Sequence, residues 1–134
     1  MMRVAKSNRS EAVGRQRTAR AYLEVAELVL AEPSREEYLS VAAGLAVLAG
    51  IAASDALCGT RLGKRHRGED HRGALELLAH ATPDGRDLAN QLGRLLDVKD
   101  AAHYGVVVVS ATKARSAVRA AAQLVARAAE ELER

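Results

Sequence analysis

Four side chains that could take part in acid–base or charge-stabilising chemistry stand together between positions 99 and 104. They are Lys99, Asp100, His103 and Tyr104, in a chain otherwise rich in alanine, leucine and valine. If this segment is helical, Lys99 and His103 share one face, as do Asp100 and Tyr104, because residues four apart are neighbours on a helix. The inward positions of a bundle helix are normally apolar. This polar group therefore predicts a functional site.

The chemistry that these residue types favour is cleavage of RNA without a metal ion. That reaction needs a base for the 2′-hydroxyl proton, an acid for the leaving oxygen and a cation for the charge on phosphorus. An imidazole such as that of His103 can act as base or acid near neutral pH, and Lys99 can supply the cation. The same spacing is also typical of a polar cluster that satisfies itself at a helix end or a dimer surface.

A carboxylate, Asp55, interrupts the most apolar segment of the chain. Burying a charged carboxylate is costly unless it has a partner. In an antiparallel bundle, the segment that carries Asp55 can lie beside the segment that ends at His103. We therefore expect Asp55 to pair with Lys99 or to orient His103, either within a site or as a structural ion pair.

Charge is distributed unevenly along a chain whose net charge is +3. Residues 1–20 and 61–72 are basic, whereas residues 21–60 are acidic. Two basic segments around an acidic one suit an anionic partner, most often a nucleic acid, although a solvated tail and loop would have the same composition. Because Phe and Trp are absent, binding by base stacking is not expected. The residues predicted to contact phosphate are Arg61, Lys64, Arg65, His66 and Arg67, together with the N-terminal arginines.

Several classes of site and location are not expected. Cys58 is the only cysteine, which excludes an intramolecular disulfide and favours a buried thiol in a cytoplasmic protein. The four histidines lack the paired spacing of zinc ligands, and the glycines form no phosphate loop. The apolar run 41–53 is shorter than the ~20 residues that cross a bilayer, and the N-terminus is too polar for a signal peptide. We expect no metal, no cofactor and no membrane partner.

Length and composition predict one all-α domain over residues 1–134, with residues 1–8 as a flexible basic N-terminus. Strong helix formers and only two prolines favour an up-and-down bundle of four to five helices. Ser34 begins a capping-box pattern, Asp70, Asp84 and Ser110 are expected to cap the later helices, and Gly105 is expected to end one. The expected helices are 7–31 (starting at Ser7 or Ser10), 35–62, 71–80, 85–103 and 111–133. A basic loop is expected at 63–68 and an extended connector at 106–109.

Three segments, taken in order, resemble a HEPN domain, an α-helical superfamily found in prokaryotic toxin–antitoxin pairs. The first is the apolar helix 44–57, which carries Asp55. The second is 70–78, similar to the family's third helix with a histidine followed by two leucines. The third is 99–105, similar to the family's Arg-Asn/Asp-x-x-x-His region. Here Lys99 occupies the position of the arginine. Three residues separate it from His103, where the family has four to six between the arginine and the histidine.

The resemblance implies a four- or five-helix bundle that often forms a homodimer. Many members are metal-independent endoribonucleases of toxin–antitoxin type, paired with a nucleotidyltransferase-type antitoxin. By this resemblance the chain is an RNA-binding protein in which His103 is the acid–base and Lys99 stabilises charge. Asp55 and Asp100 would orient them, and Tyr104 would contact substrate. The alternatives are a non-catalytic interaction or dimerisation module and a partner subunit that binds a nucleotide between its helices.

Overall fold

The computed structural model describes residues 3–32, 35–68, 71–103 and 109–134, with the backbone alone at 100–103. Most of this chain is helical, which confirms the all-α class, and a small two-stranded sheet is added to the helices. The elements are β1 (Val4–Lys6), α1 (Arg9–Leu30), α2 (Glu36–Leu62), β2 (Lys64–His66), α3 (Arg72–Ala79), α4 (Gly85–His103) and α5 (Ala111–Glu133).

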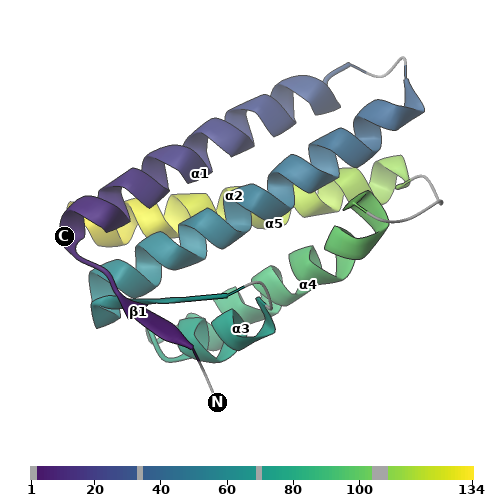
Figure 1. Cartoon of the computed structure of the whole chain (residues 1–134). Coiled ribbons are helices and arrows are strands. Elements are labelled where there is room, and N and C mark those ends of the chain that lie inside the picture. Colours follow the sequence, from purple (N-terminus) through teal and green to yellow (C-terminus); the bar gives the residue numbers. More distant parts are fainter. Residues whose placement is uncertain (1–2, 33–34, 69–70, 104–108) are drawn as a thin grey trace.

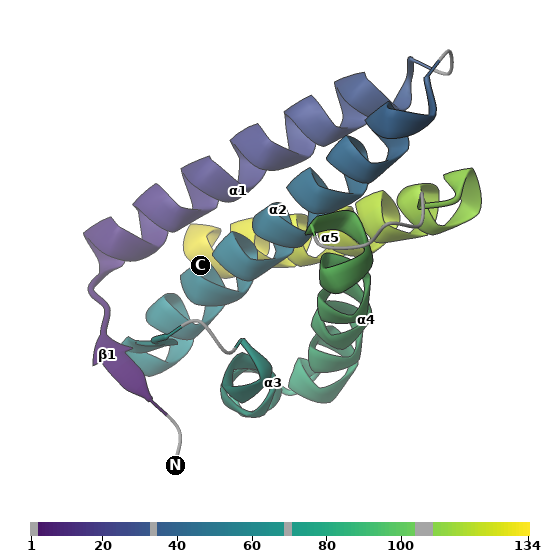
Figure 2. The ribbon, with the colours of Figure 1, turned by 45° about the vertical axis from the view of Figure 1, so that its right-hand side comes forward.

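Helix α2 lies at the centre of the fold and packs against all four other helices (Figure 1). It is apolar on nearly every side, and such a helix needs neighbours on every side. Helices α1 and α2 form an antiparallel hairpin, while α4 crosses α2 steeply in Figure 2. By length and composition alone α2 could cross a membrane, but 83% of its apolar window is buried inside the fold.

Small side chains allow the helices to approach closely, and the core is built of Ala, Leu and Val as expected. At Gly50 of α2, a Cβ atom would collide with the side-chain end of Leu95 from α4, and Leu124 from α5 is 3.4 Å away. Three helices therefore meet at this glycine. Leu57, Leu78, Leu92, Leu95 and Leu124 are the largest side chains sealed in the core.

The two strands were not expected. β1 pairs antiparallel with β2, with Val4 opposite His66 and Lys6 opposite Lys64. Gly63 ends α2 with a left-handed φ of 66°, which turns the chain back, and its carbonyl accepts a 2.9 Å hydrogen bond from the Ser7 N–H. Residues 4–6 of the N-terminus that we expected to be flexible therefore form a strand, and residues 64–66 of the expected loop at 63–68 form its partner.

The predicted helix ends are only partly correct. Ser110 caps α5 as predicted, since its Oγ accepts a 3.1 Å hydrogen bond from the Lys113 N–H. Helix α2 begins after Arg35, which makes no side-chain cap, so the N-cap lies one residue later than predicted. The Asp84 carboxylate accepts hydrogen bonds from Thr82 and Arg127. Ser34, Asp70, Gly105 and residues 106–108 lie outside the described residues.

Candidate functional site

Helix α4 extends through His103, so the segment that carries the predicted acid–base cluster is helical as expected. Lys99 is half-buried. The side chains of Asp100 and His103, and all of Tyr104, lie outside the described residues. The proposed roles of these four residues therefore stay predictions.

The predicted contact between Asp55 and Lys99 is wrong. Asp55 pairs with Arg15 of α1, whose Nη2 and Nε lie 3.0 and 3.1 Å from Asp55 Oδ2. Val98, next to Lys99, packs against the cluster that contains Ala43. Asp55 lies about 12 residues further along α2, which is about 18 Å. The C-terminal end of α4 therefore lies near the N-terminal part of α2, far from Asp55.

The Arg15–Asp55 pair lies in a surface pocket of about 610 Å³. Helix α1 forms one wall, α2 forms the floor, and β2 with the residues that follow it forms the other wall. Of the residues predicted from sequence, Asp55 and Arg65 are brought together here. Arg15 and His66 were predicted only as members of basic segments that would contact phosphate, and His71 was not predicted as a site residue. The pocket is lined by Glu11, Gly14, Arg15, Thr18, Ile51, Asp55, Arg65, His66, Gly68 and His71.

Asp55 is a buried carboxylate with only 8% of its surface exposed. Burial raises its pKa, and the charge and hydrogen bond of Arg15 oppose this increase, with smaller contributions from the charges of Arg65 and His66. Because burial is the larger effect, the pKa of Asp55 lies above its ordinary value. The carboxylate is a group that holds Arg15 in place, and water reaches it poorly.

Two imidazole rings meet on the other wall of the pocket. The ring centroids of His66 and His71 are 6.2 Å apart, and the ring planes are inclined by 56°. Gly73 makes room for this arrangement, because a Cβ there would lie 2.7 Å from His66 Nε2. The two histidines are five residues apart on either side of Gly68. The contact between the two rings depends on β2, which carries His66, and on α3, which begins after His71. The sequence alone does not predict it.

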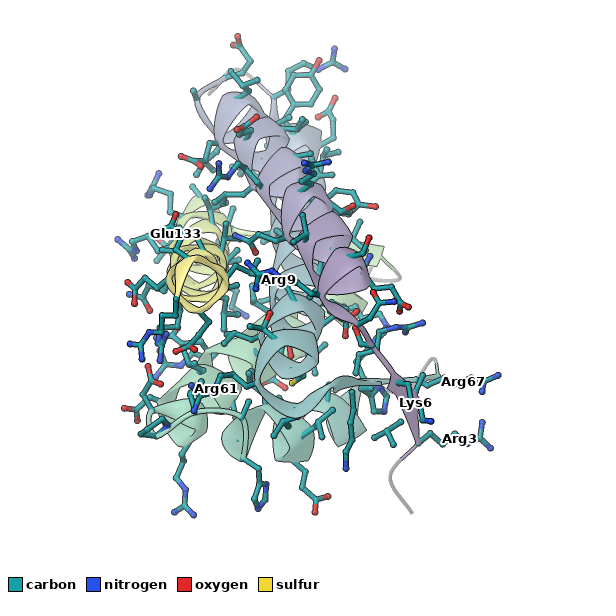
Figure 3. All side chains as sticks on the ribbon, turned by 90° about the vertical axis from the view of Figure 1, so that its left-hand side faces the viewer. Arg3, Lys6, Arg9, Arg61, Arg67 and Glu133 are labelled. Atoms are coloured by element: carbon teal, nitrogen blue, oxygen red, sulfur yellow. The ribbon has the colours of Figure 1, made fainter. Side chains whose placement is uncertain are left out.

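Four exposed cations lie on the two strands next to this pocket, and we call them the basic strand pair: Arg3 and Arg67 on one face of the strands, and Lys6 and Lys64 on the other. Lys6 lies directly opposite Lys64, and the Arg67 N–H donates a 2.9 Å hydrogen bond to the Arg3 carbonyl. Figure 3 shows Arg3 and Arg67 pointing away from the fold. Within the described residues, no acidic side chain lies within ion-pair distance of these four.

Arg61 is separate from this cluster, as Figure 3 also shows. Its Nη1 lies 3.3 Å from Glu131 Oε2, and its Nε donates to the Ala81 carbonyl at 3.2 Å. Burial alone would raise the pKa of Glu131, but the hydrogen bond from Arg127 and the nearby arginine charges lower it overall. Arg61 thus belongs to an ion-pair network between α2 and α5, and the structure does not bring it to Lys64, Arg65 and Arg67.

A second cavity, of about 470 Å³ and mainly apolar, lies between α4 and α5. A cavity between two helices is the kind of site that the alternative of a nucleotide-binding subunit would use. None of the residues predicted from sequence lines it. Its lining residues are Arg94, Leu95, Asp97, Val98, Val109, Ser110, Lys113, Ser116, Ala117 and Ala120.

Metal and thiol chemistry receive no support from the described part of the chain. Its His, Cys, Asp and Glu side chains form no group of three or more placed to hold a metal ion. Cys58 is 1% exposed, and burial raises the pKa of its thiol to about 12. A thiol in that state is a packing group, as expected from the sequence.

No protein-family model matches the chain, and no curated protein matches it. The resemblance to HEPN domains therefore stays a prediction from three short segments.

Proposed function

We propose that the chain binds RNA through its phosphate backbone, with the basic strand pair and the adjoining pocket as the contact surface. The observation that carries this proposal is the pairing of like charges across the two strands. Lys6 faces Lys64, and Arg3 faces Arg67. Like charges directly opposite in an antiparallel pair are destabilising. A polyanion that contacts either face of the strands offsets the repulsion between the two cations on that face and gains affinity by releasing its counterions.

Backbone contact, as opposed to base stacking, fits the side chains that are present. Tyr22 and Tyr38 are the described aromatic residues apart from histidine, and neither lines the pocket. The contact surface supplies ammonium and guanidinium groups, which bind phosphate without reading base sequence. We therefore expect affinity that depends strongly on salt and weakly on sequence.

Removal of the lysine pair tests the proposal. In the Lys6→Ser/Lys64→Ser variant, affinity for a single-stranded RNA should fall at least tenfold at low salt. The slope of log K against log salt should become shallower by about 1.4, since each phosphate contact on a single strand contributes about 0.7. Fluorescence anisotropy between about 50 and 200 mM salt measures both.

The matched control is Arg115→Ser/Arg119→Ser, which removes the same charge from two exposed positions of α5. This control should change the affinity by less than twofold. Equal losses in the two double variants would reduce the effect to net charge and contradict the proposed surface. Binding to vesicles of anionic lipid without binding to RNA would also contradict it.

The HEPN resemblance extends the proposal to metal-independent cleavage, with His103 as acid–base and Lys99 as the charge-stabilising group. The same resemblance extends the proposal to a toxin that is neutralised by a nucleotidyltransferase-type antitoxin. An RNA digest in EDTA with wild type and His103→Ala tests the cleavage. Cleavage that disappears in the variant supports the extension, whereas equal absence of cleavage in both proteins contradicts it.

A second candidate is a self-associating module, and an exposed apolar stripe favours it. The stripe consists of Val25 in α1 with Val41 and Leu48 in α2, which are 46%, 48% and 36% exposed. Val41, Leu48 and Asp55 recur every seven residues and so lie along one side of α2. A second copy related by a two-fold axis would bring the basic pocket end of one protomer to the acidic end, near Glu36 and Glu37, of the other.

A further inference from the structure

We propose that the pocket beside the basic strand pair binds the phosphomonoester at an end of an RNA chain. This inference rests on the proposed function, because the strand pair supplies the backbone contacts next to the pocket. A terminal phosphate carries about −1.5 to −2 charges at pH 7, against one for each internal phosphate. A pocket walled by α1 on one side and β2 on the other also suits a chain end better than a continuous strand.

Arg15 is held ready for such an anion. Asp55 Oδ2 accepts hydrogen bonds from Arg15 Nε and Nη2, and this fixes the guanidinium plane. The Nη1 hydrogens are not used by Asp55, and within the described residues they have no other acceptor. Arg15 remains 36% exposed at the pocket wall. A guanidinium with a fixed plane loses little freedom when it binds a phosphate.

The opposite wall supplies further donors. Arg65, His66 and His71 line the same pocket, and a ring separation of 6.2 Å allows two imidazoles to bind different oxygens of one phosphate. Two carboxylates line the pocket and oppose an anion: Asp55, which is buried and paired with Arg15, and Glu11 at the first turn of α1, which is exposed. Removal of the Glu11 charge should therefore strengthen the binding of a dianion.

Gly14 gives independent support for a ligand in this space. It lies inside α1, where glycine is less stable than alanine, and its φ is not positive. A Cβ at Gly14 would meet no atom of the protein within 4 Å. No packing contact within the fold therefore requires a glycine here. The absent side chain leaves room in the pocket, which explains the glycine if a ligand occupies that room.

The experiment compares RNA oligonucleotides of one sequence that differ only at their ends. Oligonucleotides with a 5′-phosphate, a 3′-phosphate or hydroxyl ends compete for the wild-type protein against an internally labelled RNA. We expect one phosphorylated form to compete at least tenfold better than the hydroxyl-ended form, and the two phosphorylated arms identify which end is bound. Equal competition by all three would overturn the inference, while salt-dependent binding in the same assay would leave the proposed function standing.

Two substitutions then locate the preference. Gly14→Leu places a side chain in the pocket, at a position where its Cβ meets no atom of the protein within 4 Å, and should reduce the preference for a phosphorylated end to less than twofold. Glu11→Gln removes the opposing charge and should increase the preference. The matched control is Ala21→Leu, at an exposed position two turns further along α1, and it should retain the wild-type preference. A preference that survives Gly14→Leu, or that is lost equally in Ala21→Leu, would overturn the assignment to this pocket.

Discussion

Asp55 is a charged group kept inside the fold by Arg15, and its chemistry is set by two opposing effects. Burial makes the carboxylate harder to ionise, and the guanidinium makes it easier. The balance lies on the side of burial. Arg15 in turn is oriented by this carboxylate, so the ion pair costs stability while it positions a pocket residue.

This balance predicts how stability depends on pH. The pKa of Asp55 is higher in the folded protein than the value of about 3.9 in the unfolded chain. In the pH interval between these two pKa values, the folded state holds the proton more tightly than the unfolded state does. The free energy of unfolding therefore falls as pH rises through this interval, on the order of 1 kcal/mol per pH unit. Asp55→Asn cannot titrate and should lack this fall. Urea unfolding of both proteins, from about pH 4 upward, measures it.

Asp84 provides a comparison with the opposite sign. Hydrogen bonds from Arg127 and Thr82 lower its pKa to about 2, so its contribution is lost as pH falls below about 4. If the free energies of unfolding of wild type and Asp55→Asn differ by the same amount at every pH, the interpretation of Asp55 is contradicted. The effect of Asp84, being confined to acid, would not disguise that result.

At the scale of elements, the crossing of α2, α4 and α5 depends on the absence of a side chain at Gly50. Gly50→Val should destabilise the fold by about 2 kcal/mol, because Leu95 must leave its position in a packed core. Gly14→Ala, in contrast, should stabilise α1 by about 0.5–1 kcal/mol, since its new methyl group meets nothing. Thermal unfolding measures both, and equal shifts of the same sign would contradict this account.

The strand pair is an element whose stability and proposed binding should respond in opposite directions. Lys6→Thr removes the like-charge contact with Lys64 and introduces a residue that favours strands. We expect a gain of about 0.2–1 kcal/mol in stability, together with weaker RNA binding. Urea unfolding and anisotropy on the same preparation measure the two effects. A variant that is less stable and binds RNA as well as wild type would contradict the assignment.

The helices could be predicted from the sequence because their signals are local. Ser110 marks the start of α5, and apolar periodicity marks the buried faces of the helices. The strand pair could not be predicted, because each strand has three residues and no alternating apolar pattern, and the pairing joins positions about 60 residues apart. Pairing between strands so far apart in the sequence depends on how the whole chain folds.

The candidate site was only half accessible to sequence reasoning for the same reason. Asp55 stood out because it is a charge in an apolar helix, and Arg65 stood out in a basic run. Arg15 did not, since an arginine on the polar face of a terminal helix is typical of a solvated surface. Its role depends on how α1 lies against α2, and the crossing of α4 likewise decided against Lys99 as the partner.

At the scale of the whole molecule, the apolar stripe and the pocket share one face, so self-association and RNA binding would compete for it. If the chain dimerises through the stripe, Val41→Lys/Leu48→Lys should convert the dimer to a monomer, because the interface would bury charge. Sedimentation velocity measures the oligomeric state. The control is Val4→Lys, an exposed apolar position of β1 and so outside the two helices that form the stripe.

Two outcomes of this experiment are informative. If the Val41→Lys/Leu48→Lys variant is still a dimer, the interface lies elsewhere. If the wild-type protein is itself a monomer, the second candidate function is excluded at the concentrations used. A dimer that dissociates when RNA is added would indicate that both partners use the same face.

The central position of α2 has a consequence for how the protein is made. This helix is complete about 70 residues before α5, the last element that covers it, has been synthesised. At roughly 5–20 residues per second, the ribosome leaves the most apolar segment of the chain without its final neighbour for about 4 to 14 s. A nascent chain in that state is a substrate for chaperones, and a message truncated before α5 would yield an aggregating product.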